Sequence, residues 1–328
     1  MNNVLLEVKD LETSLKINNE WLATVENISF ELSKGEVLGI VGESGCGKSI
    51  LSKSIIKLLP EKISKLSNGE VIFDGKRIDT LNEKQLLDIR GNDIAMIFQE
   101  LMTALNPVFT IKNQLVESIK SHKKISKKEA NKLAKDLLKK VGIARQDEIL
   151  NSYPHQLSGG MRQRVMIAMA ISCSPKLLIA DEPTTALDVT IQAQILDLLK
   201  ELQKETQMAI MMITHDLSVV AEFCDKVLVM YAGQIVEFGG IKEILHNPKH
   251  PYTQKLLSTI PKLKEEQKRL ETIEGIVPSI QAFHVNKCRF ANRCNKKLDI
   301  CNNQSPKMHV CEDVIVRCHL YKNEYKEI

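Results

Sequence analysis

The first clear pattern of apolar positions lies at residues 36–41. This short run is apolar and partly β-branched, a composition typical of a buried strand. Several glycines follow it directly, and in residues 49–59 the apolar side chains then recur at helical spacing. The pattern therefore predicts a strand, a glycine-rich loop and a helix in succession.

Two further apolar runs, at residues 176–180 and 208–213, predict buried strands. Between them, residues 189–202 have the periodicity of an amphipathic helix. Strands that alternate with helices are typical of a parallel sheet covered by helices. The pattern indicates an α/β fold for the centre of the chain.

The remaining periodic segments predict a different kind of structure at the start of the chain. Residues 7–8, 27–32 and 70–73 have the alternation of antiparallel strands, whereas residues 83–90 and 126–140 are helical in pattern. We expect a small antiparallel sheet and a helical region in addition to the α/β core.

Composition narrows the class of protein. With 43% hydrophobic and 26% charged residues among 328, the chain is neither disordered nor a coiled coil or collagen. No apolar run approaches the length of about 18 residues that spans a membrane, and the first ten residues lack the pattern of a signal peptide. We expect a globular protein of the cytosol.

Charge and cysteine separate the last seventy residues from the rest. The net charge of +4 is too small to indicate a nucleic-acid-binding protein. From residue 259 onward there are 13 basic residues against nine acidic ones, so this segment carries all of the net charge. It also holds five of the eight cysteines. We predict two parts, 1–258 and a Cys-rich extension at 259–328.

The glycine-rich loop carries the clearest chemistry. Its sequence fits the P-loop pattern G-x-x-x-x-G-K-[ST] between a predicted strand and a predicted helix. Successive backbone N–H groups and the helix N-terminus bind phosphate, Lys48 reaches the β- and γ-phosphates, and Ser49 ligates Mg²⁺. The predicted ATP-binding residues are Gly42, Glu43, Ser44, Gly45, Cys46, Gly47, Lys48 and Ser49.

Two carboxylates end the apolar run at 177–182. Asp181, at the end of a strand, is suited to hold Mg²⁺ directly or through water. Glu182 comes next and is suited to polarise the water that attacks the γ-phosphate. A P-loop followed by such a pair predicts an ATPase.

Residues 157–164, LSGGMRQR, resemble the signature sequence of ATP-binding cassette (ABC) proteins. Gln99 resembles the Q-loop of this family, residues 186–188 its D-loop with Asp188, and His215 its switch histidine. These motifs occur in the order of the family, and the resemblance covers residues 4 to about 258.

The resemblance implies a P-loop NTPase fold with a RecA-like core, an antiparallel β subdomain and an α-helical subdomain at about 83–170. It also implies roles: Gln99 senses Mg²⁺ and the attacking water, and His215 contacts the γ-phosphate. Ser158, Gly159 and Gly160 form a second anion site that acts on the nucleotide of a partner cassette. Catalysis would then involve Glu182, His215 and Gln99.

Residues 250–257 and 275–278 resemble the ATPase subunits of oligopeptide, dipeptide and nickel importers. This branch implies ATP-driven uptake of peptides, with nickel or a metal chelate as the alternative cargo. The implied partners are a second ABC ATPase, two membrane permeases and an extracytoplasmic solute-binding protein, with no nucleic acid. The expected location is peripheral, at the cytoplasmic face of the membrane.

Two other classes of function remain open at this point: a cassette protein that acts on ribosomes or DNA, and a regulatory zinc or nucleic-acid module. If the chain acted on ribosomes or DNA, these would stimulate its ATPase activity. The ATPase of an importer would not respond to them. Trp21, the only tryptophan, is a candidate for stacking on adenine, although packing explains it equally well.

Clustered cysteines in a reducing compartment indicate metal ligands rather than disulfides. Cys288, Cys294, Cys301 and Cys318 are similar to the C-terminal Cys motif of this importer branch, which is associated with a four-iron four-sulfur (4Fe-4S) cluster. Zinc bound by four thiolates and unliganded thiols are the alternatives. Cys311 competes with Cys318 as the fourth ligand.

Overall fold

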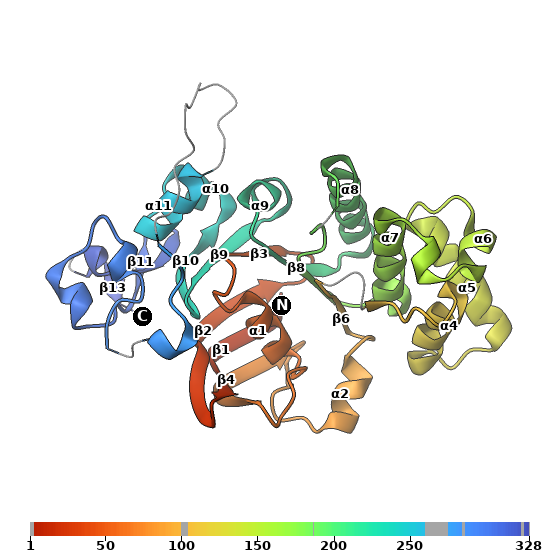
Figure 1. Cartoon of the computed structure of the whole chain (residues 1–328), viewed down its shortest axis with the longest axis horizontal. Helices are drawn as coiled ribbons and strands as arrows, with labels where there is room; N and C mark the ends of the chain where they lie inside the picture. The colour runs from red at the N-terminus through yellow and green to blue at the C-terminus, as the bar shows by residue number, and fades with distance from the viewer. Residues whose placement is uncertain are drawn as a thin grey trace. The chain divides into compact units, whose positions relative to one another are not determined.

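The computed structural model describes residues 3–99, 104–185, 187–259, 275–283, 286–322 and 325–327 (Figure 1). These residues form two compact units, which are described separately. The first unit contains Ser33–Glu36 and Thr80–Met211, and the second contains the other described residues.

The second unit begins with the antiparallel sheet that the sequence predicted. Its four strands have the order β2-β1-β4-β5, and β1 pairs with β4 from Leu6 opposite Phe73 to Leu15 opposite Ser64. An irregularity between Lys9 and Thr13 interrupts the alternation of β1, which is why periodicity identified only fragments of these long strands. The strands are β1 (Val4–Ile17), β2 (Glu20–Ser33), β4 (Ser64–Phe73) and β5 (Lys76–Arg77).

A mixed sheet forms the core of the second unit. Strand β3 (Val37–Val41) is buried along its whole length and pairs in parallel with β9 (Lys226–Tyr231), which pairs antiparallel with β10 (Gln234–Gly240). The helices of this part are α1 (Lys48–Ile55), α9 (Leu217–Phe223), α10 (Ile241–His246) and α11 (Pro251–Ser258). The predicted succession of strand, glycine loop and helix is therefore confirmed.

The C-terminal segment adds strands to this same sheet. Strands β11 (Met308–Cys311) and β12 (Val314–Arg317) form a hairpin, and β12 pairs with β10 through Glu237 opposite Val316. The remaining elements are β13 (Lys326–Glu327), which pairs with β11, and the short helices η3 (Ile280–Ala282), η4 (Ala291–Arg293), η5 (Asp299–Asn302) and η6 (His319–Tyr321). The extension is thus hydrogen-bonded to the core, and the boundary at residue 258 stays a prediction.

The first unit contains a pair of parallel strands and a group of helices. Strands β6 (Ile94–Ile97) and β7 (Leu177–Asp181) pair from Ile94 opposite Leu177 to Ile97 opposite Ala180. The helices are α2 (Glu83–Ile89), α4 (Ile111–His122), α5 (Lys127–Lys140), α6 (Gln146–Asn151), η1 (Pro154–Gln156), α7 (Gly159–Ala170), η2 (Ile171–Cys173) and α8 (Val189–Thr206).

Strand β8 (Ala209–Thr214) follows α8 and is buried throughout. The predicted helices at 83–90, 126–140 and 189–202 and the predicted strands at 176–180 and 208–213 are all present. In the part of the chain that the structure describes, no helix is both long and apolar enough to cross a membrane.

Candidate functional site

The P-loop connects β3 to α1 and is shaped by glycines at left-handed or otherwise restricted backbone angles. Gly42 has φ 155°, and a Cβ there would lie 2.3 Å from the carbonyl oxygen of Met230. Gly47 has φ 103° and precedes the first residue of α1 without a side-chain cap. The first N–H groups of α1 are thus left to an outside acceptor such as phosphate.

Lys48 lies over this loop. Its side chain is buried, and Nζ donates hydrogen bonds to the carbonyl oxygens of Gly42 at 2.7 Å and Glu43 at 3.1 Å. An ammonium held at this place is suited to transfer its hydrogen bonds to the β- and γ-phosphates. Cys46 is buried as well, and burial raises the pKa of its thiol. Only its backbone is suited to contact a nucleotide.

Gln99 and Glu182 meet in the first unit. Gln99 follows β6 and Glu182 follows β7, so the parallel pairing brings both residues to the same edge. Gln99 Nε2 donates to Glu182 Oε2 at 3.0 Å, and Thr185 Oγ1 donates to the same oxygen at 2.8 Å. Glu182 also has φ 49°, a left-handed conformation that costs about 1 kcal/mol or more in a residue with a side chain. The carboxylate is held in one orientation.

Asp181 is the last residue of β7 and is only 1% exposed. Its carboxylate and the hydroxyl of Ser49 are hard oxygen donors, which is the ligand chemistry that Mg²⁺ prefers. The donor set therefore fits a magnesium ion, and the assignment of Ser49, Asp181 and Gln99 to that ion stays a prediction.

The signature residues begin helix α7. Ser158 is its N-cap, and Ser158 Oγ accepts a hydrogen bond from Met161 N at 3.3 Å. A Cβ on Gly160 would lie 2.8 Å from Cγ2 of Ile191 in α8, so this position requires glycine for close approach. Ser158 is exposed, and Gly159 is half-buried. An exposed, capped helix start of this kind suits an anion from another molecule.

The D-loop and the switch histidine occupy helix starts too. Asp188 precedes α8, whereas its neighbour Ala186 lies outside the described residues. His215 is exposed between β8 and α9. The next residue, Asp216, caps α9, because its Oδ1 accepts a hydrogen bond from Ser218 N at 2.8 Å. The P-loop and His215 belong to the second unit, and the other motif residues belong to the first. Their roles in catalysis stay predictions.

Two residues far along the chain contact the P-loop, one in α11 and one in the Cys-rich extension, and neither contact was predicted from the sequence. Tyr252 in α11 accepts a hydrogen bond at its OH from Glu43 N at 2.9 Å. Arg293 in η4 donates to both carboxylate oxygens of Glu43, at 2.6 and 2.9 Å. Arg293 adjoins Cys294 in the Cys motif, but nothing in its spacing indicates a contact some 250 residues away. Trp21 is 40% exposed on β2, with Lys65 Nζ 4.7 Å from its ring centre.

The four predicted thiol ligands interact with one another. Burial, with a smaller contribution from the neighbouring Cys288, Cys294 and Cys301, raises the pKa of Cys318 to about 12. Burial likewise raises the pKa of Cys288 to about 11. Cys311, the last residue of β11, is fully buried. The choice of Cys318 over Cys311 as the fourth ligand stays a prediction.

The arrangement is not that of a formed metal centre. Within the described ranges, no three or more His, Cys, Asp or Glu side chains are grouped so that they hold a metal ion. Four thiols within electrostatic reach nevertheless match the donor type of a four-thiolate site, in which each sulfur must first lose its proton. The four thiols are thus the right donors for such a site, but they are not arranged as they would be around a bound metal.

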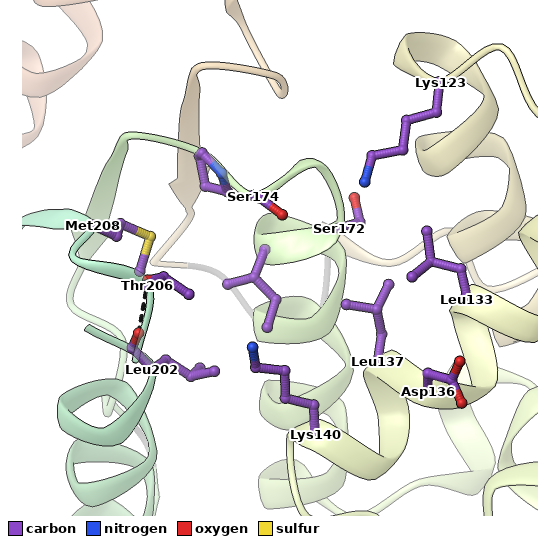
Figure 2. Close-up of a pocket in the computed structure, with 12 residues that line it drawn as sticks. Lys123, Leu133, Asp136, Leu137, Lys140, Ser172, Ser174, Leu202, Thr206 and Met208 are labelled. Atoms are coloured by element: carbon purple, nitrogen blue, oxygen red, sulfur yellow. Dashed lines mark hydrogen bonds between the residues drawn. The ribbon is translucent and has the colours of Figure 1, made fainter. Parts of the chain in front are cut away.

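A separate cavity of about 200 Å³ lies in the first unit and contains none of the motif residues (Figure 2). Leu133, Leu137 and Leu202 are among its apolar lining residues, and Lys123 and Lys140 line it as well. Lys140 Nζ donates to Glu205 Oε1 at 2.9 Å, so its charge is paired. This cavity is not the nucleotide site.

Two family models match the chain. One, described as "ABC transporter", matches residues 25–185, and the other, described as "Oligopeptide/dipeptide transporter, C-terminal region", matches residues 236–301. The second match begins in β10 and ends at Cys301, so it includes Tyr252 and Arg293.

Relatives extend these matches over nearly the whole chain. The chain is 47% identical to the oligopeptide transport ATP-binding protein AppD of Bacillus subtilis over 99% of both chains. It is 49% identical to the probable peptide ABC transporter ATP-binding protein y4tR of Sinorhizobium fredii, over 93% of this chain and 91% of the relative.

Solved structures agree with the fold. A dimer of the ATP-binding cassette MJ0796 with ADP and phosphate has a TM-score of 0.65 and 29% identity, covering 72% of this chain and 99% of the other. CbiO1 of Clostridium perfringens, part of the transporter complex CbiONQ, has a TM-score of 0.64 and 30% identity, covering 75% of this chain and 92% of the other.

Proposed function

This chain belongs to the family of ABC transporter ATP-binding proteins, in its oligopeptide/dipeptide branch, and from that premise we propose that it hydrolyses ATP to power peptide import. The observation that carries the proposal is the 47% identity over 99% of both chains to an oligopeptide transport ATP-binding protein. The curated relatives are peptide transport proteins, so nickel is not the favoured cargo.

Binding of ATP follows from the P-loop. The amides of residues 42–47 and the start of α1 receive the phosphates, and Lys48 exchanges its bonds to Gly42 O and Glu43 O for bonds to phosphate oxygens. Mg²⁺, when bound, neutralises charge on the phosphates. Ser49, Asp181 and Gln99 are the residues that would hold it.

Hydrolysis is assigned to Glu182. Its oxygen Oε2 already accepts two hydrogen bonds, and its other oxygen is suited to orient an attacking water. His215 would contact the γ-phosphate. Water activation by a fixed carboxylate needs no covalent intermediate on the protein.

The working unit is proposed to be a pair of cassettes. The exposed start of α7, with Ser158, Gly159 and Gly160, would complete the nucleotide site of a second ABC ATPase subunit. The similarity of this chain to a cassette solved as a dimer with ADP and phosphate supports this pairing. Closure on ATP and opening after hydrolysis would then move the attached subunits.

The remaining partners follow from the family. Two integral membrane permeases would form the path for the peptide, and an extracytoplasmic solute-binding protein would deliver it. This chain would lie at the cytoplasmic face of the membrane, where ATP is available, and would not contact the peptide or a nucleic acid.

For the extension at 259–328 we propose a 4Fe-4S cluster held by Cys288, Cys294, Cys301 and Cys318, with zinc as the competing ion. The mutual interaction of these four thiols supports the donor set. Such a cluster would add a covalent link between the turns that carry these cysteines.

The test uses the assembled complex. The chain is co-expressed with the two permeases and the second ATPase of its transport complex and is reconstituted in vesicles with the binding protein. ATP-dependent uptake of a labelled oligopeptide is expected, and Lys48→Ala should abolish it. If ribosomes or DNA stimulated the ATPase activity and the permeases did not, the chain would instead be a cassette protein that acts on ribosomes or DNA.

A further inference from the structure

We propose that Arg293 is a positioning residue of the nucleotide site, through which the Cys-rich segment controls the affinity of the P-loop for ATP. The inference rests on the proposed ATPase function and adds a way in which the Cys-rich segment regulates ATP binding. Its basis is one residue of the P-loop, Glu43, whose polar groups are all engaged.

Glu43 is held at three points. Its N–H donates to the OH of Tyr252 at 2.9 Å, and its carbonyl oxygen accepts from Lys48 Nζ at 3.1 Å. Its carboxylate accepts two hydrogen bonds from the Arg293 guanidinium, at 2.6 and 2.9 Å. Because the same residue supports Lys48 and is fixed by Arg293 of the Cys-rich segment, the shape of the loop depends on that segment.

Arg293 is itself firmly placed. Its side chain is only 6% exposed, and its NH2 also donates to Gly275 O at 3.1 Å. The guanidinium lies 5.7 Å from the ring centre of Tyr231, which packs edge-on against Tyr252 and Phe290. A planar, bidentate arginine beside an aromatic ring makes a contact that lysine does not reproduce.

Charge explains why this contact matters for ATP. Glu43 places a carboxylate within the loop that must receive a polyanion, and an unpaired carboxylate there would oppose phosphate. Arg293 neutralises it from the side of η4 and keeps it turned to that side. The pair is largely shielded from water, so salt screens it only weakly.

The same arginine lies within the Cys motif. Helix η4 (Ala291–Arg293) joins Cys288 to Cys294, and Cys288 N donates to Cys301 O at 3.0 Å. Lys255 Nζ in addition donates to Arg293 O at 2.8 Å. A change in the conformation of the 288–294 turn must therefore move Arg293 and, through it, Glu43.

The test compares steady-state ATP hydrolysis by the assembled complex carrying the wild-type chain, Arg293→Ala or Arg293→Lys. For Arg293→Ala we expect the KM for ATP to rise about tenfold, the equivalent of about 1.4 kcal/mol, with kcat within about twofold of wild type. Arg293→Lys should lie in between. Arg293→Ala combined with Glu43→Gln should regain most of the lost affinity, because it removes the uncompensated charge.

Lys307→Ala is the matched control, because it removes a positive charge from the same segment at an exposed pair with Glu327. It should leave KM unchanged. A folded Arg293→Ala protein with wild-type KM, or one in which kcat falls while KM stays constant, would overturn the proposal. Wild-type protein that fails to hydrolyse ATP would instead count against the proposed function.

Discussion

Gln99 and Glu182, 83 positions apart in the sequence, share a hydrogen bond of 3.0 Å between Gln99 Nε2 and Glu182 Oε2. Strands β6 and β7 bring them together, and Thr185 adds a second bond to the same carboxylate oxygen. The residue proposed to orient water is therefore held by the residue proposed to sense Mg²⁺. Movement of Gln99 would release one of the two restraints on Glu182.

Gln99→Ala removes that restraint without altering the carboxylate. A hydrogen bond to a charged group contributes about 1.5–3 kcal/mol, so kcat should fall by about tenfold or more. ATP affinity, measured with the same protein, should change by less than threefold. Gln99→Glu serves as a second variant, because it replaces the donor by a repelling charge; activity equal to wild type in both variants would disprove the positioning role.

Glu182→Gln keeps the shape of the side chain and removes its charge. Turnover should slow by about 100-fold or more, because a positioned base contributes roughly that much, while ATP binding persists. Single-turnover hydrolysis and equilibrium binding of ATP separate the two effects. Unchanged turnover would remove Glu182 from its proposed role.

Lys48→Ala deletes the ammonium that bonds Gly42 O and Glu43 O. Nucleotide binding should be lost at concentrations that saturate the wild-type chain, because nothing else in the loop supplies a positive charge to the β- and γ-phosphates. Lys53→Ala, in the last turn of α1, is the control on the same helix and should bind normally. A normal affinity in Lys48→Ala would contradict the P-loop assignment.

The motifs predicted the local chemistry well because each depends on a short stretch of chain. The P-loop needs only β3, the glycines and α1, and the turn after β7 needs only Asp181 and Glu182 beside their strand. Periodicity failed where alternation is interrupted, as in β1, where Asp10 has φ 46° near an irregular pairing. There the sequence predicted fragments of a 14-residue strand.

Contacts between distant segments could not be predicted from the sequence. Nothing in the spacing of Tyr252 or Arg293 indicates that both meet Glu43, because such pairs depend on how β10, α11 and η4 fold back on the loop. The hairpin of β11 and β12 likewise extends the core sheet through β10, whereas composition indicated a separate appendage. Tertiary pairing, not local pattern, decides these features.

The tail cysteines give a prediction with a visible outcome. Protein purified without oxygen should absorb broadly in the visible range, and Cys318→Ser should lose that absorption, because Cys318 interacts with the other three thiols. Cys311→Ser is the matched control and should keep it, since Cys311 lies in β11. A colourless wild-type protein with one bound zinc would decide for zinc, and equal loss in both variants would contradict the choice of Cys318.

The acid stability of the fold should depend on His250. This side chain is buried, and burial lowers its pKa to about 3, whereas in the unfolded chain it titrates near 6.5. Between these pH values the unfolded state binds a proton that the folded state does not, so the free energy of unfolding falls as pH drops, by about 1.4 kcal/mol per unit.

In the wild-type chain, Tyr252 N donates a hydrogen bond to His250 Nδ1 at 3.0 Å at the start of α11. His250→Asn removes the titration of this residue and keeps a side-chain acceptor for Tyr252 N. Denaturant unfolding at pH 7 and pH 5 measures the difference. Wild type should lose about 2 kcal/mol more than the variant over this interval. Glu237, whose pKa is raised by burial, accepts bonds from Lys249 N and His250 N in the wild-type chain and is present in both proteins, so its titration cancels. Equal losses in the two proteins would mean that His250 is already protonated in the folded chain at pH 5.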